Sequence, residues 1–167
     1  MTRFEKLSIA FCLWLLMTPL QAAQAQSGLR FQTDPNAPLN LKAEKMRWDQ
    51  KAGRSDLSGR VRVRQGPMQV TAARMQVRFG ADGAAESLTA QDNVVLINED
   101  GQRAEATRMD FDLRKDILLM RENVVMQAMT PKGQNQKLSG AALSIDMVSG
   151  QARLTGGKNR ARIELQP

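Results

Sequence analysis

The sequence contains two near-copies of one short segment, DNVVL from Asp92 and ENVVM from Glu122, separated by 122 − 92 = 30 residues. A second pattern recurs at a similar interval: a small residue, two mixed residues, a long apolar residue, a polar residue and an apolar or aromatic one. Periods of this size indicate supersecondary units that stack on one another. The long apolar members of the second pattern are Met46, Met75, Met109 and Leu143.

The repeating unit is built from strands, because apolar residues alternate with polar ones at period two. Val61 and Val63 alternate with arginines, and Met75 and Val77 alternate with polar residues. Such alternation is typical of strands with one buried face. Turn sequences such as ADG at 81–83 separate the runs. The pattern therefore disfavours a solenoid of helix pairs.

The alternation changes phase at the same place in each unit. Ala72 is followed by Met75 and Ala106 by Met109, a step of three residues. In a straight strand this step would move the apolar set to the opposite face, so a bulge or bend is needed. The sequence therefore predicts an all-β fold of two facing antiparallel sheets, built from repeated strands that each bend at a corner.

The N-terminal residues have the three-part layout of a secretory signal. Arg3 and Lys6 precede an apolar run at 7–20, and small residues at Ala23 and Ala25 follow it. The run is shorter than the roughly 20 residues of a membrane-spanning helix. We predict a cleaved signal peptide at 1–25, a flexible segment at 26–37 and a single domain at 38–167; an uncleaved membrane anchor is the alternative.

The residue types argue against an enzyme. The sequence has no histidine, and its one cysteine, Cys12, lies in the predicted signal peptide. The commonest general base and the thiol nucleophile are therefore absent from the mature chain. Asp110 and Asp112 have a spacing that two metal ligands can adopt, but the alternation predicts an outward, solvated position for both. We expect no catalytic residue, no metal and no cofactor.

The composition leaves two interpretations of the interior open. The chain has ten methionines, and aromatic residues make up only 4%. Methionine is flexible and adapts to irregular or changing partners, so the interior is either an ordinary closed core or a slot that accepts lipid chains. The net charge of the mature chain is 22 − 16 = +6, which favours solubility or an anionic partner.

Both ends of the domain are predicted to be edge strands, LNLKA at 39–43 and RARIEL at 160–165. Edge strands carry unpaired backbone groups and invite pairing with another chain, unless charges such as Arg160 and Arg162 prevent it. The sequence alone does not favour one outcome.

The segment PLNLKAEKMRWDQKAGRSDLSGRVRVRQGPMQVTAARMQV at 38–77 resembles the opening of the lipopolysaccharide-transport periplasmic protein A family, also called organic-solvent-tolerance A-like. The resemblance extends over roughly Pro38 to Leu165. One departure is Arg60, where the family often has Asn. The matching residues are Leu39, Leu41, Gly59, Val61, Val63, Gln65, Gly66, Ala72, Val77, Ala106, Met109, Asn123 and Val124.

The resemblance implies an open β-jellyroll in the periplasm that shields the acyl chains of lipopolysaccharide. It also implies a bridge: an inner-membrane-anchored homologue at the N-terminal edge, the N-terminal domain of an outer-membrane translocon at the C-terminal edge, and self-association edge to edge. The alternatives are a structural assembly protein with a closed core, and a membrane-anchored homologue of the same fold.

Strand phase and the family match together predict a set of inward apolar residues that bind lipid. The inward residues are Leu39, Leu41, Met46, Trp48, Val61, Val63, Met75, Val77, Val94, Leu96, Met109, Phe111, Val124, Met126, Leu143 and Ile145. Lys42, Lys45 and Arg47 are candidate contacts for the lipid phosphates.

Overall fold

The computed structural model describes residue 31 and residues 37–129, 134–158 and 160–166, apart from the side chains at 165 and 166. The predicted signal peptide at 1–25 and most of the segment at 26–37 lie outside these residues. Within them, no helix is long and apolar enough to cross a bilayer. The strands are β1 Leu39–Lys42, β2 Lys45–Asp49, β3 Arg54–Gln65, β4 Met68–Phe79, β5 Ala85–Ile97, β6 Arg103–Asp112, β7 Ile117–Met129, β8 Asn135–Asp146, β9 Ala152–Thr155 and β10 Arg162–Gln166.

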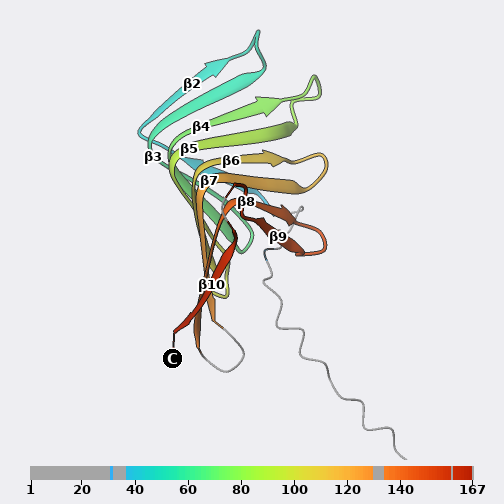
Figure 1. Cartoon of the computed structure of the whole chain (residues 1–167). Coiled ribbons are helices and arrows are strands. Elements are labelled where there is room, and N and C mark those ends of the chain that lie inside the picture. Colours follow the sequence, from blue (N-terminus) through green and yellow to red (C-terminus); the bar gives the residue numbers. More distant parts are fainter. Residues whose placement is uncertain (1–30, 32–36, 130–133, 159, 167) are drawn as a thin grey trace, which may run out of the picture.

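The strands of the described chain form one antiparallel sheet that bends into two leaves (Figure 1). The order is β1-β3-β4-β5-β6-β7-β8-β10, while β2 also pairs with β3 and β9 also pairs with β8. We call the leaf with β2 and β9 the first leaf, and the leaf with β1 and β10 the second leaf. Strands β3 to β8 cross from one leaf to the other. The predicted all-β fold of facing antiparallel layers is confirmed, and the layers are two parts of one continuous sheet.

The corner between the leaves explains the repeat in the sequence. Asp92–Asn93 in β5 have φ angles of 62° and 53°, and Glu122–Asn123 in β7 have 65° and 56°. Gly59–Arg60 occupy the equivalent place in β3, at 78° and 42°. This left-handed region is strained for most residues, and Asp and Asn tolerate it better because their short side chains form local hydrogen bonds. The two near-copies therefore mark the same corner one hairpin apart.

The strands that carry these pairs have one residue more than their neighbours at the corner. Gln91 pairs with Arg108 and Val94 with Ala106, so three steps along β5 lie opposite two along β6. The register shifts in the same sense in β3 and in β7. An extra residue in one strand of a pair bends that strand and increases its twist. The corner predicted from the three-residue phase step is thus a row of β-bulges.

Apolar side chains from the two leaves meet in the space between them and form one hydrophobic cluster. Val61 and Met126 reach it from the second leaf, and Val77, Met109 and Leu143 reach it from the first, each at most 1% exposed. Burying a side chain of this size stabilises the fold by about 1.5–3 kcal/mol. The leaves are therefore held face to face mainly by hydrophobic burial.

Candidate functional site

One continuous row of apolar side chains crosses the first leaf. Residues directly opposite each other on neighbouring strands lie on the same face of a sheet. The members of this first-leaf row between its two ends are at most 2% exposed. From β2 to β9 the row is Met46, Leu57, Met75, Ala90, Met109, Met120, Leu143 and Leu154.

A second apolar row crosses the other leaf and belongs to the same hydrophobic cluster over most of its length. Its members between the two ends are at most 9% exposed. From β1 to β10 this second-leaf row is Leu41, Val63, Val70, Leu96, Ala104, Met126, Leu138 and Ile163. We call the space between the two rows the trough.

The apolar rows continue to both edges of the sheet, where they become exposed. Met46 on β2 is 59% exposed, and Ile163 on β10 is 61% exposed. Trp48, also on β2, is 55% exposed, and its ring meets that of Phe79 edge-on with centroids 4.8 Å apart. Large exposed apolar side chains at a sheet edge are typical of an interaction surface. The trough is therefore unsealed at both ends of the described sheet.

A hollow of about 340 Å³ lies where the two leaves separate. Leu39 lines it from the second leaf, while Ala85, Phe111 and Leu113 line it from the first-leaf side. All four side chains are only partly buried. This hollow brings together two predicted lipid-binding residues, Leu39 and Phe111, from opposite leaves.

A protein-family model described as "LptA/(LptD N-terminal domain) LPS transport protein" matches residues 40–151. The chain belongs to this family. The match covers β1 from its second residue through to the end of β8, and therefore includes both leaves and every corner bulge.

The fold of this LptA-family chain is similar to that of a solved relative. The crystal structure is of LptH, the LptA homologous periplasmic component of the lipopolysaccharide transport device from Pseudomonas aeruginosa. The two superpose with a TM-score of 0.66 at 16% sequence identity, over 81% of this chain and 99% of LptH. Among curated proteins, no match to the chain was found.

Most of the predicted inward residues of the LptA-family chain lie in the hydrophobic cluster. Leu39, Leu41 and Phe111 are partly buried against it. Whether any of these side chains binds lipid stays a prediction. The fully buried ones are Val61, Val63, Met75, Val77, Val94, Leu96, Met109, Val124, Met126, Leu143 and Ile145.

Met46 and Trp48 are the two predicted inward residues that are exposed. The register places Met46 opposite buried Leu57 and Trp48 opposite buried Ser55, so both lie on the inner face. Strand β2 is an edge strand, however, and no further strand among the described residues extends the cover beyond it. Their exposure follows from this position.

Several members of the cluster were not predicted from the sequence. Phe31 is fully buried there, although it lies in the segment predicted to be flexible. Leu118 and Met120 are also buried, whereas Leu119 between them faces outward and is half-buried. The register could have found Met120, because it lies opposite the predicted Met109. No comparable pattern pointed to Phe31.

The three candidate phosphate contacts all lie on the outer face, and only two lie together. Lys45 and Arg47 line a groove of about 620 Å³ with Arg74 and Arg108. Lys42 lies on the second leaf opposite Arg62. The outer face thus carries the cations, and the inner face carries the apolar rows.

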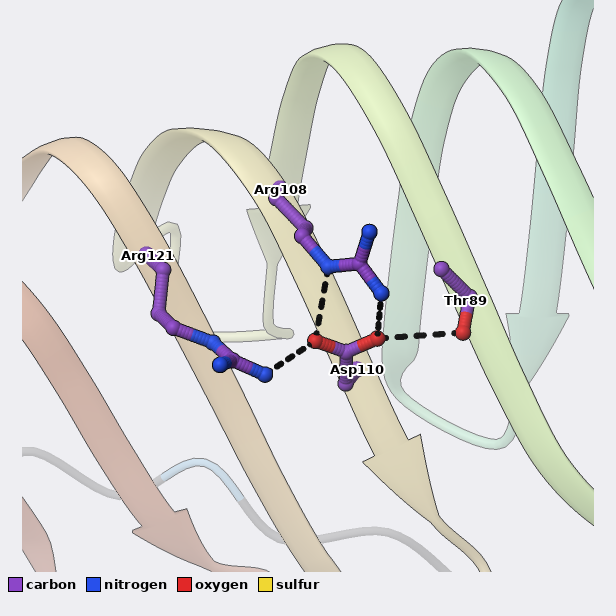
Figure 2. Close-up of polar contacts among 4 residues, drawn as sticks. All are labelled: Thr89, Arg108, Asp110 and Arg121. Atoms are coloured by element: carbon purple, nitrogen blue, oxygen red, sulfur yellow. Dashed lines mark hydrogen bonds and ion pairs between the residues drawn. The ribbon is translucent and has the colours of Figure 1, made fainter.

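Asp110 is the centre of a polar network on the outer face (Figure 2). Arg108 donates two hydrogen bonds to its carboxylate, at 3.0 and 2.8 Å, and Thr89 donates one at 3.1 Å. Arg121 donates another at 2.5 Å. Partial burial acts to raise the pKa of Asp110, but the hydrogen bonds from these three residues outweigh it and hold the pKa below its usual value.

This network also bears on the metal interpretation. The Asp110 carboxylate is already satisfied by two guanidinium groups, and Asp112 accepts backbone N–H groups of Arg114 and Lys115. Among the described residues, no group of three potential metal ligands is found. Asp110 faces outward as predicted, but it holds β5, β6 and β7 together instead of facing solvent freely.

We expect Asp110→Asn to lower the free energy of unfolding by about 1 kcal/mol near neutral pH, because it removes charge-assisted hydrogen bonds that solvent partly screens. A carboxylate whose pKa is lower in the folded state contributes stability above its unfolded pKa of about 3.9 and loses it as the pH falls. The difference between variant and wild type should therefore shrink in acid. Chemical denaturation at neutral and acid pH measures it.

Glu105→Gln is the matched control, since Glu105 lies on the same strand and has an ion pair with Arg103 at 2.6 Å. An exposed pair of this kind is expected to contribute less than about 0.5 kcal/mol. Equal losses in the two variants, or a loss at Asp110 that is independent of pH, would contradict the assigned role of the network.

Proposed function

We propose that this protein carries lipopolysaccharide across the periplasm, with the acyl chains lying between the leaves. The observation that carries this proposal is the pair of apolar rows that reach both edges uninterrupted, together with membership in a family of LPS transport proteins. Each CH₂ group removed from water contributes about 0.8 kcal/mol, so acyl chains need such cover throughout their passage. A row of similar apolar residues offers nearly uniform affinity and lets a chain slide.

The proposal includes a bridge between membranes. In the part of the chain that the structure describes, β1 and β2 leave one edge of the sheet unpaired, and β9 and β10 leave the other. We propose that the first edge receives an inner-membrane-anchored relative and that the second meets the N-terminal domain of the outer-membrane translocon. Backbone hydrogen bonds of added strands would continue the sheet, as in other cases of β-strand addition.

A structural assembly protein with a dry core is the second candidate. It is favoured by the complete burial of Met109 and Met120, which pack with other apolar side chains in the hydrophobic cluster between the leaves. Methionine rearranges readily, so the same side chains can also move aside for an acyl chain. The two candidates therefore differ in whether lipid enters the trough.

Photo-crosslinking in living cells decides between them. A photoreactive residue at Phe111, in the hollow, or at Met75, in the first-leaf row, is expected to form adducts with lipopolysaccharide. The same residue at Gln76, the outward neighbour of Met75, is the control and should give none. Protein adducts alone at Phe111 and Met75 would instead support the dry assembly protein.

A further inference from the structure

The direction of the strands allows another sheet to continue this one at either edge. An odd number of antiparallel pairings separates β2 from β9, and likewise β1 from β10. The two edge strands on each leaf therefore run in opposite directions. A second copy stacked in the same orientation would meet this chain with antiparallel strands on both leaves. When the corners are aligned, every cross-strand row continues from one copy into the next.

The inner rows do not distinguish between a second copy and another partner. Stacking places Leu154 beside Met46 and Ile163 beside Leu41, the two ends of each apolar row. These contacts would cover Met46 and Ile163, the exposed ends of the rows. Any sheet with an apolar inner face would do the same.

The outer rows do distinguish them. One outward row runs from Arg47 on β2 to Arg153 on β9, so stacking brings these two arginines directly opposite each other. On the second leaf the outward row runs from Lys42 to Arg162, which meet in the same way. All four side chains are exposed. Like charges directly opposite on neighbouring strands are destabilising.

The directly opposite positions beside these pairs bring no opposite charges together. In the same register Lys45 would face Thr155, and Asn40 would face Glu164. Glu164 is 3.7 Å from Arg162, in the one ion pair among the described residues that includes any of the four cations. Glu44 lies at the corner, but its carboxylate is held by Arg60 at 2.6 Å. No facing position of this register pairs opposite charges.

We propose that these four cations select against a second copy of this chain, and that each edge receives the edge strand of a different protein with carboxylates opposite them. The apolar rows permit stacking, and the outer charges decide which partner is stable. This inference rests on the proposed bridge. It names the chemistry of the partner: Asp or Glu side chains opposite Arg47 and Lys42 at one edge, and opposite Arg153 and Arg162 at the other.

The test is self-association of the mature chain, followed by light scattering over a concentration series. The unmodified chain should be monomeric at low salt and associate more tightly as salt rises toward about 1 M, where the screening length of about 3 Å is shorter than the spacing of opposite side chains. Lys42→Glu with Arg47→Glu makes the two edges complementary, and should tighten head-to-tail association by about tenfold or more at low salt.

A charge cycle provides the controls. Arg153→Glu with Arg162→Glu should have the same effect from the other edge. All four reversals together restore like charges and should return the chain to a monomer at low salt. Arg78→Glu with Lys115→Glu changes the net charge equally but lies on β4 and in the β6–β7 turn, away from both edges, and should leave association unchanged.

Two results would overturn the inference: self-association of the unmodified chain that weakens as salt rises, or edge reversals with no more effect than the control pair. Circular dichroism confirms that each variant is folded, and the salt dependence of the unmodified chain stands even where a variant is not. Lipid adducts at Phe111 report separately on the proposed function. Their absence would end the lipid-carrier proposal and leave the charge result intact.

Discussion

Val61→Asp is expected to lower the free energy of unfolding by about 4 kcal/mol or more, and to abolish lipid adducts in the trough. Val61 is fully buried on the second leaf, opposite buried Ala72 and next to the corner. It belongs to the hydrophobic cluster between the leaves, where a carboxylate loses its hydration. The carboxylate must therefore either stay protonated or force the leaves apart. Urea denaturation followed by circular dichroism measures the loss.

Arg62→Asp is the matched control, because it introduces the same side chain one position further along β3 on the exposed outer face. We expect a change within about 0.5 kcal/mol, as for most surface substitutions. The Val61→Asp variant should also recover part of its stability in acid, since burial raises the pKa of an unpaired carboxyl group. If the Val61→Asp variant were as stable as the Arg62→Asp variant, the inner face would be wrongly assigned.

The corner could be predicted because the residues buried on either side of it are apolar, so the change of phase is visible in the sequence. Ala72 pairs with Val61 on the second leaf and Met75 with Leu57 on the first, and all four are buried. A three-residue step between two inward residues is impossible in a straight strand. The three-residue step therefore predicts a bend, and its recurrence along the sequence predicts a bend in each repeated unit.

The sequence pattern did not indicate the burial or exposure of other residues. The run Ile117–Met120 is apolar throughout, so its alternation has no phase, and only the register shows that Leu118 and Met120 face inward. For Met46 and Trp48, the alternation predicted that the side chains lie on the inner face of the sheet, but it did not predict that they are exposed. Exposure depends on whether a neighbouring strand extends the cover, which is a property of the whole sheet. Lys42 was grouped with Lys45 because the two are close in sequence, but they pair with opposite halves of β3 on different leaves.

Deleting Asn93 is expected to prevent cooperative folding. Asp92–Asn93 supply the extra residue of β5 at the corner, where Gln91 pairs with Arg108 and Val94 with Ala106. With one residue fewer, β5 has the same three-residue step at the corner as β4 and β6, and it loses the bulge that bends it against both neighbours. In a regular, unbent ladder that step places Val94 and Leu96 on the face opposite to Leu88 and Ala90.

Since these four side chains are at most 3% exposed, the loss should be comparable to that in Val61→Asp. Central strand β5 pairs with both β4 and β6, so the loss of its extra residue would disturb the hydrogen bonding to both neighbours. We expect broad, non-cooperative denaturant transitions for the deletion and a single sharp transition for the parent chain, measured side by side.

Substitutions at Asn93 separate the effect of the extra residue in β5 from the effect of its left-handed backbone conformation. Asn93→Gly keeps the extra residue and accepts the φ of 53° without strain, so it should change stability by only a few tenths of a kcal/mol. Asn93→Val keeps the phase but places a β-branched side chain in the left-handed region, and should lose about 1–2 kcal/mol. The deletion alone removes the extra residue. A deletion variant as stable as Asn93→Val would mean that backbone strain, and not the count of residues, determines how each strand turns from one leaf into the other.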